Sequence, residues 1–386
     1  MRETAVEKSY IFIVMFFISL IMRIQTPVFT PYVVGFGATS ILIGVILSVT
    51  SFTNLVGNLF AGPLIDRFGK KMFITIPLFF SGILFIAHGL ASGANQLLVL
   101  HALNGFALAF LIPAALALLS GYAKNRRDQG KNMAINGILT TTASIIAPPI
   151  GGKMVEWIGY ANTYFFIGSA IFLTSLFAVF FLKDRQFVVK HQRQKSVSLL
   201  QVITSPSLYT IYLAGFAVMY IHGVIVFEIP YLTVEQGLST FTTGQLFSYM
   251  GLGTFLTLSL FFINRFDPLK RLVIGIFGMS MCQFAIINSI LPLSFILFFV
   301  GLFFGLIMPA IATAITEVVS GEAYGKAFGV MSAVYSLGMI VSSFITGIIR
   351  DVVSPYFIAF LVGMLVVTII GYTKLSAPQA VRPEVR

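Results

Sequence analysis

Twelve long apolar runs, each able to cross a lipid bilayer, follow one another along the 386 residues of the chain. A spanning helix needs about 20 apolar residues. Only 10% of the residues are charged, which is too few to cover the surface of a water-soluble protein. The sequence therefore predicts an all-α polytopic membrane protein with helices near residues 9–34, 38–61, 72–92, 95–121, 132–155, 161–183, 206–232, 241–263, 272–291, 294–319, 328–350 and 355–375.

The positions of the cations predict the orientation of these helices. If the N-terminus is cytoplasmic, 21 of the 24 Lys and Arg residues fall in segments on the cytoplasmic face. Lys153 and Arg350 are then at the outer ends, and Arg23 lies within the first span. Basic loops mark the cytoplasmic side of membrane proteins. We therefore expect a multi-pass protein of the plasma membrane with both termini in the cytoplasm.

The net charge of +11 is explained by this topology and by contact with anionic lipids. It gives no reason to expect a nucleic-acid partner, and we predict none.

The two halves of the chain repeat the same features in the same order. Prolines and glycines match at offsets of 195–199 residues, as in Pro31 and Pro230, Pro113 and Pro309, Gly130 and Gly325. Such repeats build one known plan of membrane transporters. The repeat predicts two pseudo-symmetric six-helix bundles: an N-terminal bundle at 1–183, a cytoplasmic linker at 184–205, and a C-terminal bundle at 206–386.

A short basic motif separates the second and third apolar runs. Its residues follow the pattern G-x-x-x-D-R-x-G-K-K and are Gly62, Asp66, Arg67, Gly69, Lys70 and Lys71. With this motif, the helix count and the repeat, the chain resembles the major facilitator superfamily, and more closely its 12-helix drug or metabolite:proton antiporters. The resemblance extends over essentially the whole sequence and implies the fold of that family.

Two further segments resemble family motifs in part. The fifth run ends in a pattern similar to the antiporter signature G-P-x-x-G-G, with Ala147 in place of the first glycine and with Pro148, Pro149, Gly151 and Gly152 in their places. The fourth run contains His101-x-x-Asn104-Gly105 where drug–proton antiporters often carry R-x-x-Q-G. We therefore expect His101 and Asn104 on the pathway of the substrate or the proton.

The resemblance implies a conformational latch in the helix 2–3 loop. Asp66 is expected to dock against the N-terminus of the eleventh helix near Phe328, where unpaired N–H groups attract an anion. Arg126 or Arg127 would share the carboxylate as gating partners. The alternative is that Asp66 only caps a turn and that the neighbouring cations only set topology.

Ionisable groups within the spans are rare and unfavourable in lipid, so they mark functional sites. By the repeat offset, Arg23 corresponds to His222, and both are expected to point into one central cavity. Arg23 either contacts the substrate or forms a structural ion pair with Glu228. Glu228 is the candidate proton carrier, because a carboxylate in low-dielectric surroundings can exchange protons near working pH.

These features together predict a secondary active transporter that works by alternating access, as a monomer without cofactor or metal. The partial helix 5 motif favours proton-coupled efflux of a small organic compound. The alternative is proton-coupled uptake of an organic anion or another small nutrient, which Arg23 and His222 favour. A membrane enzyme or a passive channel is the competing class. The chain has no phosphate-binding loop of an ATP-driven pump.

Overall fold

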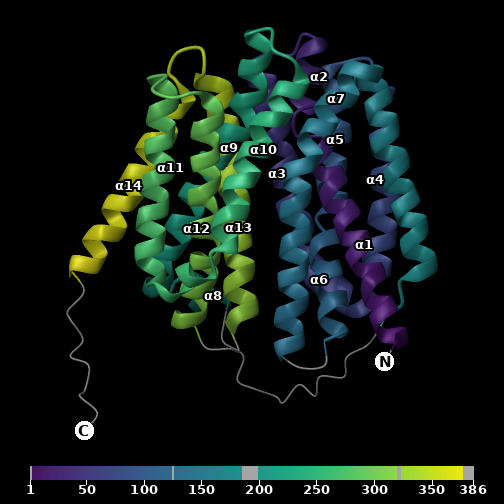
Figure 1. Ribbon diagram of the computed structural model, residues 1–386, viewed down its shortest axis with the longest axis horizontal. Coiled ribbons are helices and arrows are strands. Elements are labelled where there is room, and N and C mark those ends of the chain that lie inside the picture. The colour runs from purple at the N-terminus through teal and green to yellow at the C-terminus, as the bar shows by residue number, and fades with distance from the viewer. Residues whose placement is uncertain (1, 124–125, 185–198, 320–322, 377–386) are drawn as a thin grey trace.

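The chain folds into helices only, within the part that the computed structural model describes, residues 2–123, 126–184, 199–319 and 323–376 (Figure 1). The α-helices are α1 (Arg2–Ile24), α2 (Phe29–Gly35), α3 (Ser40–Phe68), α4 (Met72–Gly89), α5 (Ala94–Leu108), α6 (Leu111–Gly121), α7 (Arg126–Phe181), α8 (Leu199–Ile203), α9 (Pro206–Glu235), α10 (Thr240–Ser259), α11 (Pro268–Ile287), α12 (Leu293–Val318), α13 (Tyr324–Ile349) and α14 (Pro355–Ser376). A short 3₁₀ helix, η1, covers Phe261–Arg265.

The helices supply the twelve predicted passes. Ten helical stretches of the described residues are long and apolar enough to cross a membrane. One of them, α7, turns at Gly159, which has φ of 77°, and so contributes two passes. The more polar α10 packs between α7 and α12 and completes the set. The all-α polytopic fold is therefore confirmed, and the ends of the predicted runs differ from the observed helices by a few residues.

Proline breaks two of these passes and is tolerated in others. The first pass divides into α1 and α2 around Pro27, and the fourth divides into α5 and α6 just before Pro113. Proline lacks the backbone N–H that would donate a helical hydrogen bond. The helix is therefore interrupted where no neighbouring group satisfies the carbonyl left without a donor. By contrast, Pro148 and Pro230 lie inside continuous helices.

The buried apolar side chains form two separate clusters. One runs from Ile11 to Leu182 and includes Phe227 from α9, and the other runs from Val202 to Ile370. The helix α8 lies within the segment predicted as a linker and packs against α13, while residues 185–198 of that segment lie outside the described residues. Where the boundary between two bundles falls stays a prediction.

The two halves touch at one end of the molecule, which carries Gly44, Gly152 and Arg350 and is called the closed end below. A Cβ on Gly44 of α3 would lie 2.7 Å from Ser343 O and 2.9 Å from Gly347 Cα of α13. Similarly, a Cβ on Gly152 of α7 would meet the backbone of Thr240 in α10. These glycines let two pairs of helices approach to backbone contact.

The same helices part at the other end, which is called the open end. A Cβ on Gly62 of α3, on Gly130 of α7 or on Gly325 of α13 would have no neighbouring atom within 4 Å. The chain begins at this end, with α1 rising from the lower side of Figure 1. Gly44 and Gly152 thus mark places where the halves touch at the closed end, and Gly62, Gly130 and Gly325 have no such neighbour at the open end.

Candidate transport site and gates

Two cavities lie between the halves, and both are lined by helices from each half. The first, of about 290 Å³, contains only uncharged polar and apolar side chains, with histidine counted as neutral. The second, of about 270 Å³, contains one arginine. The two share α1 and α9, because Met22 and Met219 line the first cavity and Arg23 and His222 line the second.

Arg23 and His222 come together in the second cavity from opposite halves, as the repeat offset led us to expect. Arg23 lies in the last turn of α1, where the negative end of the helix dipole favours a cation. It acts electrostatically on His222, whose ring stacks on Phe304 with centroids 5.2 Å apart. Arg23 makes no hydrogen bond or ion pair with any residue that the structure describes. An exposed, unpaired cation therefore faces this cavity.

The alternative pairing of Arg23 with Glu228 is wrong. Glu228, on α9, is only 3% exposed, and its Oε1 accepts from Nε of Arg350 at 3.1 Å. The guanidinium of Arg350 comes from just beyond the end of α13, at the closed end. A buried carboxylate requires a partner, and the fold supplies Arg350 rather than Arg23.

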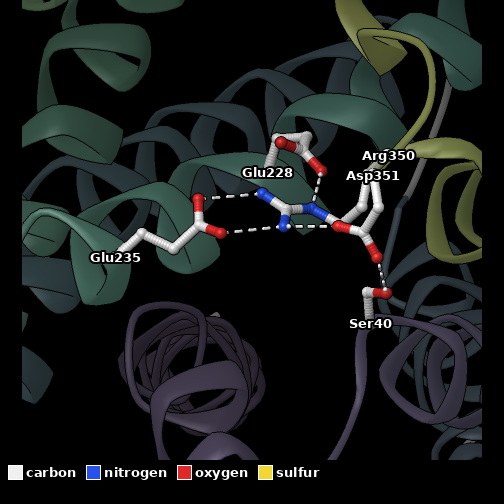
Figure 2. Close-up of polar contacts among 5 residues, drawn as sticks. All are labelled: Ser40, Glu228, Glu235, Arg350 and Asp351. Atoms are coloured by element: carbon white, nitrogen blue, oxygen red, sulfur yellow. Dashed lines mark hydrogen bonds and ion pairs between the residues drawn. The ribbon is translucent and has the colours of Figure 1, made fainter.

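Arg350 is the centre of a larger polar network at the closed end (Figure 2). Its Nη1 and Nη2 donate to both oxygens of Glu235, at 2.9 and 3.0 Å. Asp351 lies 3.5 Å from Nη1 and accepts from the hydroxyl of Ser40 at 3.4 Å. The network thus reaches from α9 across α13 to the beginning of α3 in the other half.

The guanidinium of Arg350 also stacks over the ring of Tyr231, 3.8 Å from its centroid. Burial by itself lowers the pKa of Arg350. The hydrogen bonds to Glu235 and Glu228 outweigh this effect and raise the pKa above its ordinary value. Arg350 is therefore charged at every pH at which transport can be measured. Sequence reasoning had noted Arg350 only as a cation on the unexpected side of the membrane, and that exception was the one signal of its role.

His101 and Asn104 lie together on α5 and line the first cavity. The ring of His101 stacks on Phe29 with centroids 3.8 Å apart, and its Nδ1 lies 3.3 Å from Nε2 of His88 on α4. The side-chain oxygen of Asn104 is buried without a partner among the described residues. His88 was not among the predicted site residues, because nothing in the sequence indicates that two histidines 13 positions apart meet.

The sequence suggested that the basic motif lies in a loop, but most of it belongs to a helix. Gly62, Asp66 and Arg67 lie within α3, which continues to Phe68, and only Gly69–Lys71 form the turn before α4. Asp66 is exposed and bonds to no residue that the structure describes. The helix continues because its apolar residue Ile65 is buried against the bundle.

The predicted latch contact is not made in this structure. The N-terminus of α13 has no side-chain cap, and Phe328 near this end is 38% exposed. The side chains of Arg126 and Arg127 lie outside the described residues. A latch that forms only when this end closes would not be formed in the open state seen here. The latch therefore stays a prediction.

The turn of the motif contacts a carboxylate at the end of the sixth pass. Gly69 has φ of 100°, a conformation that favours glycine, and a Cβ there would lie 2.5 Å from Oδ2 of Asp184. The same oxygen accepts from the backbone N–H of Lys71 at 3.4 Å. Asp184 therefore holds the turn, and Gly69 is required both for φ and for space.

The helix 5 motif lies where α7 crosses its neighbours at the closed end. Gly151 faces the backbone of Ile24 in α1, and Gly152 faces that of Thr240 in α10. Pro148 packs against Gly244 of α10 and lines the second cavity. Pro148 and Gly152 therefore shape the contact between the halves, Pro148 forms part of the wall of the cavity, and Gly151 packs α7 against α1.

Comparison with known proteins agrees with this architecture. The sequence profile of the Major Facilitator Superfamily matches residues 11–296 and 262–386. The chain is similar in structure to a bacterial homologue of the human lysosomal transporter Spinster, solved in an inward-facing and occupied conformation. That likeness has a TM-score of 0.74, covers 95% of this chain and 96% of the other, and has 14% identity.

Similarity in sequence extends to several transporters. The chain is 27% identical over 177 residues to the multidrug resistance protein MdtG of Enterobacter lignolyticus, which is 46% of this chain and 42% of that protein. It is 26% identical over 215 residues to the 4-hydroxybenzoate transporter PcaK of Acinetobacter baylyi, 53% of this chain and 43% of that protein. The chain thus matches less than half of the length of these curated relatives.

The match to a family of transporters places this polytopic α-helical protein, with its two central cavities, in the class of membrane transporters and not of enzymes. The chain belongs to the Major Facilitator Superfamily, as its sequence motifs had indicated.

Proposed function

We propose that this protein is a secondary active transporter that carries a small organic anion by alternating access. The observation that carries the proposal is the unpaired cation Arg23 in the second cavity. A charge within the span is unfavourable by about 2.5–3.5 kcal/mol on insertion scales. Since Glu228 is held by Arg350, no described carboxylate offsets Arg23. An anionic substrate would supply the missing partner.

The remaining groups of the second cavity suit the same substrate class. His222, Thr140, Thr141 and Thr254 offer neutral hydrogen-bonding groups around Arg23. A guanidinium binds a carboxylate through two parallel hydrogen bonds, which gives orientation as well as affinity. The relative PcaK, by its name a transporter of 4-hydroxybenzoate, is consistent with an aromatic carboxylate as substrate.

The difference between the two ends supports alternating access. The halves meet at the closed end through Gly44, Gly152 and the Arg350 network, and they part at the open end. By the distribution of cations the open end faces the cytoplasm, and the structural neighbours are inward-facing as well. Rocking of the halves would close the open end, dock Asp66 on α13 and open the other side.

Binding of a carboxylate provides the direct test. The purified chain would be titrated with 4-hydroxybenzoate and, as the uncharged match, with its methyl ester, and thermal stability would be recorded. A ligand that binds only the folded state raises the melting temperature. We expect the acid to stabilise the wild type and Arg23→Gln to lose at least tenfold in affinity, about 1.5–3 kcal/mol for a charged hydrogen bond.

Arg23→Lys is the matched variant, because it keeps the charge and loses the planar fork. It is expected to bind the acid with intermediate affinity. Equal stabilisation by the acid and the ester, or full affinity in Arg23→Gln, would refute the proposed substrate class.

A second candidate is proton-coupled efflux of a small organic compound, as the helix 5 motif suggests. The observation in its favour is the position of Pro148 and Gly152 between the halves, together with the relatives named as multidrug resistance proteins. Everted vesicles with an imposed pH gradient would be tested with the lipophilic cation tetraphenylphosphonium. Proton-driven accumulation of the cation that is lost in Glu228→Gln would favour this candidate.

A further inference from the structure

His88 and His101 are the two buried histidines that the proposed anion site does not use. His88 is fully buried and His101 is 7% exposed, and they lie on adjacent helices, α4 and α5. Nδ1 of His88 lies 2.7 Å from the carbonyl oxygen of Leu84, and Nε2 of His88 lies 3.3 Å from Nδ1 of His101. A linear chain of hydrogen bonds therefore runs from the backbone of α4 to His101.

The chain of hydrogen bonds assigns the protons. A carbonyl oxygen only accepts, so Nδ1 of His88 carries a proton and its Nε2 holds a lone pair when the ring is neutral. That lone pair accepts from Nδ1–H of His101. In the neutral pair, Nε2 of His101 is left without a proton. It bonds to no residue that the structure describes, and His101 lines the first cavity.

One position on the pair can therefore take a proton without breaking a bond. A proton on Nε2 of His88 would face Nδ1–H of His101 and remove their hydrogen bond. A proton on Nε2 of His101 leaves both bonds in place and makes the bond to His88 charge-assisted, which strengthens it. We propose that His88 and His101 form the proton-binding site of the central cavity, with the proton entering on Nε2 of His101.

Burial disfavours a charged ring at His101, and one neighbouring side chain offsets part of that cost. The ring of Phe29 on α2 is stacked on it at 3.8 Å and presents its negative face. The other titratable groups near the pair are tyrosines: Tyr32, Tyr164 and Tyr160 on the side of His88, and Tyr335 of α13 across the cavity. Among the charged groups of the packed helices, Arg23 faces the second cavity and Glu228 is paired with Arg350.

Protonation of this pair adds a positive charge to a cavity whose lining carries none. A proton and an anion would then favour each other's binding, since such coupling is reciprocal. A carrier that binds both together moves both in one direction, so the site predicts co-transport of proton and anion. This consequence rests on the proposed function, whereas proton binding itself does not.

Nuclear magnetic resonance tests the proton site without any substrate. The chain has four histidines, so ¹⁵N-histidine labelling gives few signals, which His→Gln variants assign. At high pH we expect both His88 and His101 to be protonated on Nδ1 only. As the pH is lowered from about 8, through the range in which histidines change their charge, Nε2 of His101 should gain a proton while His88 keeps its tautomer. A proton on Nε2 of His101 at high pH, or no titration of His101, would overturn the proposal.

Transport in proteoliposomes tests the coupling. His101→Gln keeps a polar group at the cavity but cannot titrate, and His88→Phe removes the acceptor for Nδ1–H. Both are expected to exchange labelled 4-hydroxybenzoate across the membrane and to lose accumulation driven by a pH gradient. His191→Gln, at a position outside the described residues, is the control and should behave as wild type. Full pH-driven accumulation in His101→Gln refutes the coupling role.

The two arms separate this inference from the proposed function. Titration of His101 without any binding of 4-hydroxybenzoate supports the proton site and counts against that carboxylate as substrate. If the acid binds through Arg23 and His101 does not titrate, the anion site is supported and the proton site is refuted. If His101→Gln does not fold, the resonance experiment on the wild type still decides.

Discussion

Glu228 and Arg350 are joined by a hydrogen-bonded ion pair of 3.1 Å at the closed end, although 122 positions separate them in the sequence. Only 5% of the Glu228 side chain and 9% of the Arg350 side chain are exposed. The pair connects α9 with the end of α13, and through Asp351 and Ser40 it reaches α3. It therefore links the C-terminal half to the other half on the side where the cavity is shut.

Removal of Arg350 is expected to destabilise the protein strongly. Arg350→Met leaves the buried carboxylate of Glu228 without its partner, and breaking a buried pair costs about 3–5 kcal/mol. Glu235→Gln, which alters the exposed partner, should cost less than about 1 kcal/mol. The melting temperature in detergent measures both. The double variant Arg350→Met/Glu228→Met should recover most of the loss, and a double variant as unstable as Arg350→Met would contradict the pairing.

A larger side chain at Gly44 should force the closed end apart. Gly44→Leu would push its side chain into the backbone of Ser343 and Gly347, whereas Gly35→Leu enters open space at the same end. A cysteine at Ser48, whose hydroxyl now donates to Ile340 O at 3.0 Å, reports opening by its reaction with an impermeant maleimide. We expect at least tenfold faster labelling in Gly44→Leu than in Gly35→Leu, in a background without Cys282. Equal rates would show that the closed end is not held by this contact.

Asp66→Asn should slow transport at least tenfold while leaving stability in the open state nearly unchanged. Asp66 bonds to no described residue in this structure, so its replacement removes no contact with the described part of the chain. Its predicted partner, the N-terminus of α13, is reached only when the open end closes. Asp267→Asn is the matched control. Asp267 caps the N-terminus of α11 by accepting from the backbone N–H of Lys270, and Asn can do the same. Wild-type turnover in Asp66→Asn would exclude the latch.

Gly69→Ala is expected to destabilise the turn between α3 and α4. Alanine at this position would have to adopt positive φ with extended ψ, a conformation nearly confined to glycine that costs about 1–3 kcal/mol. Its Cβ would also displace the carboxylate of Asp184. Gly371→Ala, in the open space along α14, should instead be neutral or stabilising by up to about 1 kcal/mol. Thermal unfolding of the two variants compares them, and a melting temperature of Gly69→Ala equal to that of the wild type would show that Asp184 does not constrain the turn.

The sequence by itself determined the helices and the family. In lipid each spanning segment must satisfy its own backbone hydrogen bonds, so a long apolar run is a helix almost regardless of its neighbours. The basic motif, with Asp66 and Gly69, was equally visible because it is continuous in the chain. Arg23 and His222 could be placed in one cavity because the internal repeat relates their positions.

Only the tertiary structure decided which charged and polar groups meet. Glu228 pairs with Arg350 and not with Arg23, and His88 meets His101, because these contacts depend on how whole helices rotate and pack against each other. No local pattern encodes the distance between side chains on different helices. The tertiary structure also decided which end of the molecule is closed. That choice depends on a small difference in free energy between two arrangements of the same two packed halves.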